Sequence, residues 1–235
     1  MSWRDRINIT MADFNVNHIT GKQGQQGTVL AGVTTVSSTG SMRIPSGPTE
    51  QRGGRGRGVW GGGYNPTMNT MEYITIATTG NAIDFGDFVH AKFSASAVGS
   101  PTRGIFIGGD PNQSKMYYFT FSSSGGTNTF GDLSNNHYNA SALSNDTRGL
   151  SLGGNPVITS IEYITMATTG NASSFGDLFD GNRYAAGAAS PTRGIIGGGI
   201  DASTPVAAKG TKSIQYVTIA SKGNSKDFGD LRVAR

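Results

Sequence analysis

The sequence predicts an all-β protein, with about four copies of a 45-residue, four-stranded unit preceded by an extended N-terminal arm. Three observations support this prediction. Two blocks of sequence recur in phase along the chain. Within each copy, apolar and polar residues alternate with a period of two, and no stretch keeps a helical period beyond two turns. Glycine supplies 36 of 235 residues and only 14% are charged, which suits short strands and tight turns.

Two blocks define the repeat by their constant spacing. The first is Arg-Gly followed by an apolar stretch and a glycine pair; it begins at Arg57, Arg103, Arg148 and Arg193, in steps of 46, 45 and 45 residues. The second contains a tyrosine and ends in Phe-Gly-Asp. Its phenylalanines are Phe85, Phe130, Phe175 and Phe228, in steps of 45, 45 and 53 residues. Two independent blocks in phase over four copies indicate a tandem repeat.

Each unit is expected to contain four strands. Runs of small residues, such as residues 94–98 and 184–189, predict a first strand at the crowded axis of a radial assembly. The Arg-Gly block is a short apolar run ended by glycine, typical of a buried inner strand. Segments such as 73–76 alternate β-branched and aromatic residues with polar ones, which predicts a third strand. The Phe-Gly-Asp block predicts the outermost strand, with its glycine allowing a bend.

Units of this size cannot bury both faces of a sheet alone, so radial stacking into a β-propeller is expected. The predicted domains are an arm over residues 1–50 and a propeller over residues 51–235. The chain reaches Arg235 where another small-residue strand would begin, and no such strand directly precedes Arg57. We expect either the C-terminal residues or residues 29–37 to complete the first blade. Exchange of strands between chains is the competing arrangement.

The order of these strands resembles the kelch repeat over roughly residues 57–235. The shared order is a small-residue strand, an apolar strand ending in Gly-Gly, a strand with Tyr, and a strand with an aromatic residue and Leu. One position departs from the family, because Phe stands where the kelch repeat usually has Trp in its fourth strand. The resemblance implies a kelch-like β-propeller of about four blades.

The amino-acid sequence of the repeats is also similar to that of repeats in structural proteins of tailed bacteriophages, notably those of marine cyanobacteria. The sequence motifs that carry this resemblance are EYITIATTGNA at residues 72–82 and SPTRG at residues 100–104 and 190–194. The resemblance implies a non-enzymatic protein of the virion, in a tail, neck or capsid appendage. Its partners would then be other virion proteins in a symmetric, multi-copy assembly. The alternative is an adhesion module that binds a carbohydrate or receptor on the host surface.

Each repeat carries one arginine and one aspartate at fixed positions. We expect the arginine of Arg-Gly to pair with an aspartate of Phe-Gly-Asp, because a charge buried between blades needs a partner. The arginines are Arg57, Arg103, Arg148 and Arg193, and the aspartates are Asp87, Asp132, Asp177 and Asp230. A ring of arginines that binds an anion or a carboxylated glycan is the alternative.

Other chemistries find little support in the sequence. The glycine pairs lack the Gly-Lys-Ser/Thr and the following helix of a phosphate loop. Residues 52–58 resemble an RGG box but have no interleaved aromatic residues, so a connector is favoured over a nucleic-acid partner. The chain has no cysteine, and its histidines, His18, His90 and His137, occupy unrelated repeat positions. We therefore predict no catalytic residue, cofactor or metal, and no membrane segment.

Two segments outside the repeat pattern are candidates for contact with partners. Residues 1–58 carry the whole net charge of +4, and the start of the chain alternates apolar and polar residues, which predicts a strand-like arm with one apolar face. Such an arm is poorly anchored alone, so we expect it to bind another chain. Its candidate contacts are Trp3, Arg4, Arg6, Ile7, Ile9 and Phe14. The fourth repeat holds eight extra residues within 200–213. In a propeller this loop and its equivalents in the other repeats gather on one face, called here the loop face. The candidate contacts on the loop face are Tyr64 of the first repeat and Lys209 and Lys212 of the fourth.

Overall fold

The computed structural model describes residues 29–30, 34–36, 42–43, 56–111, 114–201 and 210–235. The chain divides into two compact units, Met1–Gly47 and Pro48–Arg235. In the first unit, β1 (Val29–Leu30), β2 (Thr34–Val36) and β3 (Met42–Arg43) form an antiparallel sheet. These strands pair with one another, and the completion of the first repeat by residues 29–37 or by the C-terminal residues stays a prediction. The candidate contacts of the arm, from Trp3 to Phe14, lie outside the described residues.

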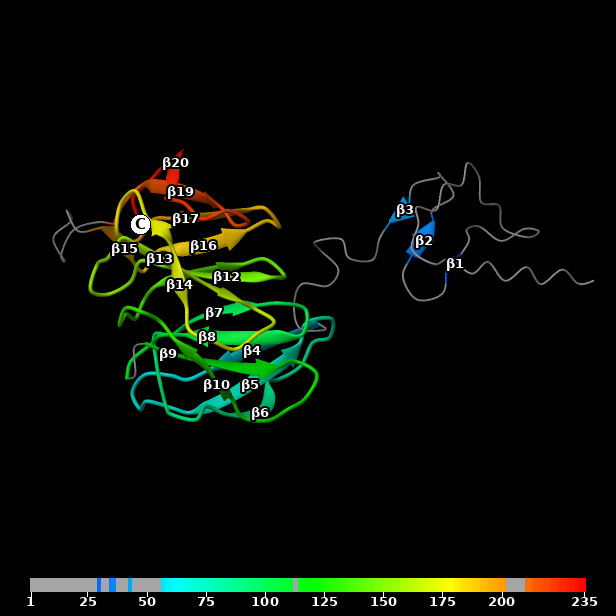
Figure 1. The fold of residues 1–235 in the computed structure, drawn as a ribbon. Helices are drawn as coiled ribbons and strands as arrows, with labels where there is room; N and C mark the ends of the chain where they lie inside the picture. The colour runs from blue at the N-terminus through cyan, green and yellow to red at the C-terminus, as the bar shows by residue number, and fades with distance from the viewer. Residues whose placement is uncertain (1–28, 31–33, 37–41, 44–55, 112–113, 202–209) are drawn as a thin grey trace, which may run out of the picture. The chain divides into compact units, whose positions relative to one another are not determined.

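The second unit contains four antiparallel sheets, named sheets 1 to 4 in chain order (Figure 1). Sheet 1 consists of β4 (Arg57–Gly61), β5 (Thr70–Thr75) and β6 (Ile83–Asp87). Sheet 2 consists of β7 (Ser96–Gly99), β8 (Arg103–Ile107), β9 (Lys115–Thr120) and β10 (Asn128–Asp132). Sheet 3 consists of β11 (Ser141–Ser144), β12 (Arg148–Leu152), β13 (Ser160–Thr165) and β14 (Ser173–Asp177). Sheet 4 consists of β16 (Ala186–Ala189), β17 (Arg193–Gly197), β19 (Ser213–Thr218) and β20 (Lys226–Asp230).

The described residues contain strands and turns but no α-helix, which confirms the all-β prediction. In sheets 2, 3 and 4 the strands lie in chain order from one edge to the other. The small-residue strand is therefore at one edge and the Phe-Gly-Asp strand at the opposite edge, as predicted. In sheet 1 only Gly56 is described directly before β4, and residues 44–55 lie outside the described part of the chain. Within that part, no helix is long and apolar enough to cross a bilayer.

Every outer strand is bulged at its phenylalanine. The register between the third and fourth strands of each sheet shifts by one residue there, leaving Phe85, Phe130, Phe175 and Phe228 unpaired. A bulge bends the strand and re-aims the side chain beside it. The predicted bend at the following glycine is confirmed; Gly86, for example, has a φ of +132°. The bend turns the ring of Phe85 into the core.

The core lies between the sheets rather than within any one of them. Three clusters of buried apolar side chains fill the spaces between sheets 1 and 2, sheets 2 and 3, and sheets 3 and 4. The described strands of sheets 1 and 4 share no extensive contact with each other. The second unit is thus a stack of four sheets, and its closure into the ring of a β-propeller stays a prediction.

The insertion in the fourth repeat begins with a short strand. Ile200–Asp201 forms β18, which pairs with β15 (Asn182–Arg183) in the connection that leads from sheet 3 to sheet 4. Residues 202–209, including the candidate contact Lys209, lie outside the described residues. The start of the insertion is therefore held against the body of the protein.

Candidate functional site

The interfaces between sheets are where the recurring side chains of this protein gather. Each sheet has a forward face, which packs on the next sheet in the chain, and a backward face, which packs on the preceding one. Between sheets 1 and 2, the ring of Phe85 lies 5.2 Å from the ring of Phe119, centroid to centroid. The phenylalanines on the forward faces are at most 3% exposed in sheets 1, 2 and 3: Phe85, Phe130 and Phe175.

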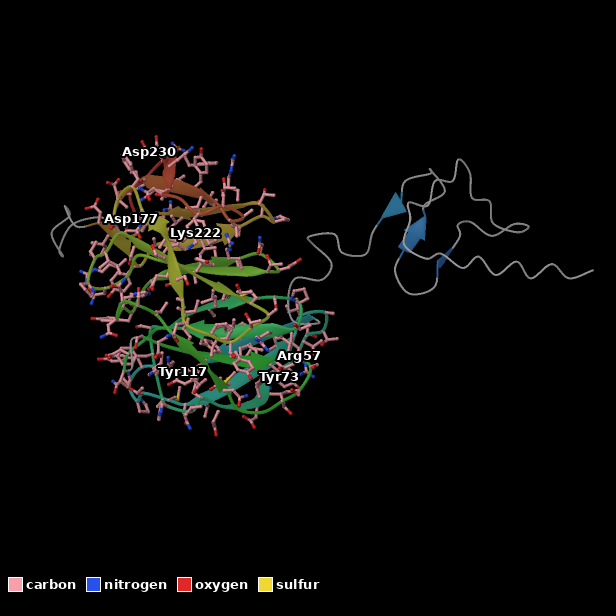
Figure 2. All side chains as sticks on the ribbon, viewed as in Figure 1. Arg57, Tyr73, Tyr117, Asp177, Lys222 and Asp230 are labelled. Carbon is pink, nitrogen blue, oxygen red and sulfur yellow. The ribbon has the colours of Figure 1, made fainter. Side chains whose placement is uncertain are left out.

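Arginine, tyrosine and phenylalanine form a stack on the forward face of every sheet. The guanidinium carbon lies 4.4 to 4.8 Å from the centroid of the tyrosine ring. The tyrosine ring meets the phenylalanine ring edge-on at 5.9 to 6.2 Å. Figure 2 labels Arg57 and Tyr73 of the first stack. The stacks are Arg57–Tyr73–Phe85, Arg103–Tyr118–Phe130, Arg148–Tyr163–Phe175 and Arg193–Tyr216–Phe228. Such a cation over a ring stabilises by about 0.5–1 kcal/mol, and by more when it is desolvated.

In sheets 1, 2 and 3 the same arginine also binds the next sheet. Its Nη1 donates to a backbone carbonyl just after the third strand of that sheet. The three bonds are Arg57 to Phe121 at 2.7 Å, Arg103 to Met166 at 3.1 Å, and Arg148 to Ile219 at 2.7 Å. A hydrogen bond from a charged donor contributes about 1.5–3 kcal/mol, so these arginines link adjacent sheets.

The predicted ion pairs between the repeat arginines and the Phe-Gly-Asp aspartates are wrong. In sheet 2, Arg103 lies opposite Thr120 at one end of β9, whereas Asp132 lies opposite Lys115 at the other end. Five residues of strand separate the two ends by roughly 17 Å, at about 3.3 Å per residue. The same register holds in sheets 1, 3 and 4. The correction applies to Arg57, Arg103, Arg148 and Arg193 and to Asp87, Asp132, Asp177 and Asp230.

The aspartates instead contact the next sheet through their backbone. The carbonyl oxygens of Asp87, Asp132 and Asp177 accept hydrogen bonds of 2.8 to 2.9 Å from the next sheet, donated by Thr127, Ala172 and Ser225. Beside them, glycine N–H groups donate to the carbonyls of Phe85, Phe130 and Phe175 at 2.6 to 2.9 Å; the donors are Gly125, Gly170 and Gly223. The outer strands are therefore joined to the next sheet by backbone groups that recur with the repeat.

An asparagine that sequence reasoning missed completes this junction. The N–H groups of Asp132 and Asp177 donate to the side-chain oxygens of Asn171 and Asn224, at 2.9 and 3.0 Å. A signal was present in the sequence, because asparagine stands four residues before the phenylalanine in three of the four repeats: Asn81, Asn171 and Asn224. Its role depends on the neighbouring sheet, which spacing alone does not place.

One position is polar and buried in all three interfaces, although its residue changes. Seven residues after the phenylalanine stand Lys92, His137 and Asn182, each at most 2% exposed. The Nζ of Lys92 donates to the Gly108 carbonyl at 2.5 Å and lies 4.6 Å from the centroid of the Tyr117 ring. Burial lowers the pKa of Lys92 from 10.5 to about 8. Burial also lowers the pKa of His137, whose Nε2 lies 2.9 Å from the Ser151 hydroxyl.

A second buried polar position accepts backbone donors from the preceding sheet. The Oε1 of Glu162 accepts from the N–H of Ser134 at 2.7 Å. At the same repeat position in sheet 4, the Oε1 of Gln215 accepts from the N–H of Phe179 at 2.8 Å. A carboxylate and an amide thus serve the same interface, since both supply an acceptor oxygen.

The loop-face residues lie at one end of the strands, called here the loop end. There the connections between the second and third strands of the sheets meet the connections that lead from one sheet to the next. The N–H of Gly63 donates to the carbonyl of Lys92 at 3.0 Å, joining the connection after β4 to the one after β6. Tyr64 lies there and is 77% exposed, and Lys212, in the equivalent connection of sheet 4, is also exposed. Phe179 and Tyr184, in the connection between sheets 3 and 4, are 67% and 58% exposed. Sequence reasoning missed both, because their positions carry no repeated residue.

In the described part of the chain, no three or more His, Asp or Glu side chains gather closely enough to hold a metal ion. The candidate site is therefore the set of interfaces between sheets, together with the exposed loop end. No protein-family model matches the sequence, and comparison with curated proteins finds no match either.

Proposed function

We propose that the protein is a non-enzymatic structural protein of a bacteriophage virion, in a tail, neck or capsid appendage, with a kelch-like repeat body displayed by its N-terminal arm. The observation that carries the proposal is that the recurring side chains contact one another and the adjacent sheets. The arginine, tyrosine and phenylalanine of each repeat stack on one another, and in three repeats the arginine also binds the next sheet. Residues used in this way build a stiff body rather than a shared reaction centre.

The resemblance of the repeat phrases to structural proteins of tailed phages supports the virion as the location. The partners are then other virion proteins, present in a symmetric multi-copy assembly. The arm, with its apolar alternation and its excess of basic residues, is the segment that attaches the body to them. The aromatic side chains at the loop end remain available for a second contact.

The experiment deletes residues 1–45 and compares the copy number of the truncated and full chains in purified particles. We expect the truncated chain to be missing from particles while its body still unfolds cooperatively in urea. A second variant, Trp3→Asp with Ile7→Asp in the full chain, should lower incorporation at unchanged length. Incorporation of both variants at the normal copy number would contradict the proposal.

An adhesion module that binds a host-surface glycan or receptor is the second candidate. It is favoured by the exposed aromatic rings of Tyr64, Phe179 and Tyr184 at the loop end. Exposed aromatic residues are typical of binding surfaces. Binding of the labelled full chain to host cells should fall for Tyr64→Ser and Phe179→Ser. It should not change for Ile83→Ser, which alters an apolar residue of β6 that is 57% exposed and lies outside the connections of the loop end.

A further inference from the structure

Among the residues that the structure describes, nothing covers one face of sheet 1 and one face of sheet 4, and these faces are the two halves of the interface that joins the other sheets. On the forward face of sheet 4, Phe228 is 51% exposed, whereas its three equivalents are at most 3% exposed. On the backward face of sheet 1, Ile76 is 61% exposed and Trp60 is 57% exposed. The residues equivalent to Ile76 and Trp60 are buried: Phe121, Met166 and Ile219 for Ile76, and Phe106, Ser151 and Ile196 for Trp60. Figure 1 shows the two sheets at opposite ends of the stack.

The apolar part of the forward face continues into a groove across sheet 4. This groove has a volume of about 420 Å³, and its lining includes Tyr184, Ala186, Ile195, Ile214 and Leu231. Residues equivalent to Ile195, Ile214 and Leu231 are buried between sheets in the interior of the stack; they are Leu150, Ile161 and Leu178 in sheet 3. The groove is thus an interface surface that lacks its neighbouring sheet.

The polar groups of the two uncovered faces match as well. Each pair occupies the repeat positions of a hydrogen bond that is present in the interior interfaces. In each pair the first group belongs to sheet 4 and the second to sheet 1. Two pairs involve side chains of sheet 1: the Asp230 N–H with the Asn81 side-chain oxygen, and the Arg232 N–H with the Glu72 carboxylate. The other three are the Arg193 guanidinium with the Ile76 carbonyl, the Phe228 carbonyl with the Gly80 N–H, and the Asp230 carbonyl with the Ala82 N–H.

Two equivalent glycines, Gly86 in sheet 1 and Gly229 in sheet 4, show the space that a neighbouring sheet would fill beside sheet 4. At Gly86 a Cβ atom would lie 2.5 Å from the carbonyl group of Gly125 in the next sheet. Gly229 has nearly the same φ, +131° against +132°, but no atom lies within 4 Å of its Cβ position. The backbone of sheet 4 is therefore already shaped for a neighbour at this junction.

We infer that a second copy of this chain covers both faces, with sheet 1 of each copy docked on sheet 4 of the other. A second copy fits because sheet 1 carries the asparagine, the glycine and the acceptor groups that the forward face of sheet 4 requires. The contact joins two different faces, and such contacts form rings when the rotation closes. Two chains give eight sheets, within the four to eight blades typical of propellers. This inference does not depend on the proposed location in a virion.

The first test uses the absence of cysteine from the chain, which makes introduced thiols the only ones present. Full chains carrying Asn81→Cys and Asp230→Cys are mixed in equal amounts and treated with a short bis-maleimide. We expect a product of twice the chain mass on a denaturing gel from the mixture and from neither variant alone. A chain with both Asp132→Cys and Asn171→Cys is the control, because its sites already contact within one chain.

Two outcomes would overturn the inference. Bridging within single chains of the Asn81→Cys, Asp230→Cys double variant, without bridging in the mixture, would show closure of one chain on itself. Absence of bridging in both, while the control bridges, would show that these faces are not joined. Both outcomes concern purified protein and are separate from incorporation into particles.

The second test measures the mass of the full chain by sedimentation. We expect twice the chain mass of 24.5 kDa. We expect Ile76→Asp and Phe228→Asp to raise the apparent Kd of the pair roughly a hundredfold, because each places a charge in an apolar contact. Ile83→Asp and Phe179→Asp are matched controls, since these side chains are 57% and 67% exposed but lie outside both faces. Equal weakening by all four variants, or a wild-type chain that stays monomeric at high concentration, would refute the inference.

Discussion

Phe175 and Phe228 occupy the same repeat position, yet the first is 3% exposed and the second 51% exposed. Both are the unpaired residue of a bulge, and both lie in an Arg–Tyr–Phe stack with ring distances of 6.2 and 6.1 Å. The local structure of each sheet is therefore complete without a neighbour, and only burial differs. The comparison teaches that a sheet of this protein determines its own side-chain arrangement, whereas the adjacent sheet determines how much that arrangement stabilises the fold.

The largest expected difference is between Phe175→Ala and Phe228→Ala. Removing a fully buried phenylalanine costs about 3–5 kcal/mol, because transfer energy is lost and a cavity remains. At the exposed position we expect a loss within about 0.5 kcal/mol in dilute, monomeric protein. Urea unfolding followed by circular dichroism measures both. Equal losses would contradict the assignment of Phe228 to an uncovered face.

Gly86→Ala and Gly229→Ala separate backbone strain from contact with a neighbour. The two glycines share nearly the same positive φ, so the strain on alanine is similar at both positions, of order 1–3 kcal/mol. Gly86→Ala should lose more stability, since its Cβ would also meet the carbonyl group of Gly125 at 2.5 Å. The measurement is the difference between the two free energies of unfolding. A difference near zero would mean that the neighbouring sheet moves away freely.

Arg148→Gln and Arg193→Gln test the link between sheets. Arg148 stacks on Tyr163 and also donates to the Ile219 carbonyl, so we expect its loss to cost about 1.5–3 kcal/mol. Arg193 is exposed and stacks on Tyr216, and we expect its loss to cost about 0.5–1 kcal/mol. Thermal unfolding of the two variants at the same low concentration makes the comparison. A larger loss at Arg193 would show that the carbonyl bond contributes little.

A pH dependence in the basic range is expected at the first interface. The pKa of Lys92 is about 8 in the folded chain and 10.5 when unfolded, so the unfolded chain binds more protons between these values. Stability attributable to Lys92 therefore falls as the pH drops from 10.5 to 8, by up to about 3 kcal/mol. The free energy of unfolding of Lys92→Met, subtracted from that of the wild type at pH 8 and pH 10, isolates this dependence. At the equivalent position of the third interface, Asn182→Ala should show no such change.

Much of the fold follows from the repeated residues. The phase of the two blocks predicts the number of sheets, the order of strands within them and the bend after each phenylalanine, because strand patterns and glycine turns are local. The pairing of Arg103 with Asp132 could not be predicted correctly. Both residues recur once per repeat, so the sequence shows only that they share a period. That they lie opposite the two ends of β9 depends on the register of the strands.

Sequence alone determined that this protein is a tandem array of β-sheets in which each copy carries one arginine, one tyrosine and one phenylalanine. Only the tertiary structure decided what those residues do. The arginine stacks on the tyrosine of its own sheet and, where a neighbour exists, binds the carbonyl of the next. The physical reason is that strand periodicity resides in local backbone geometry, whereas burial and hydrogen bonding between sheets depend on which faces meet.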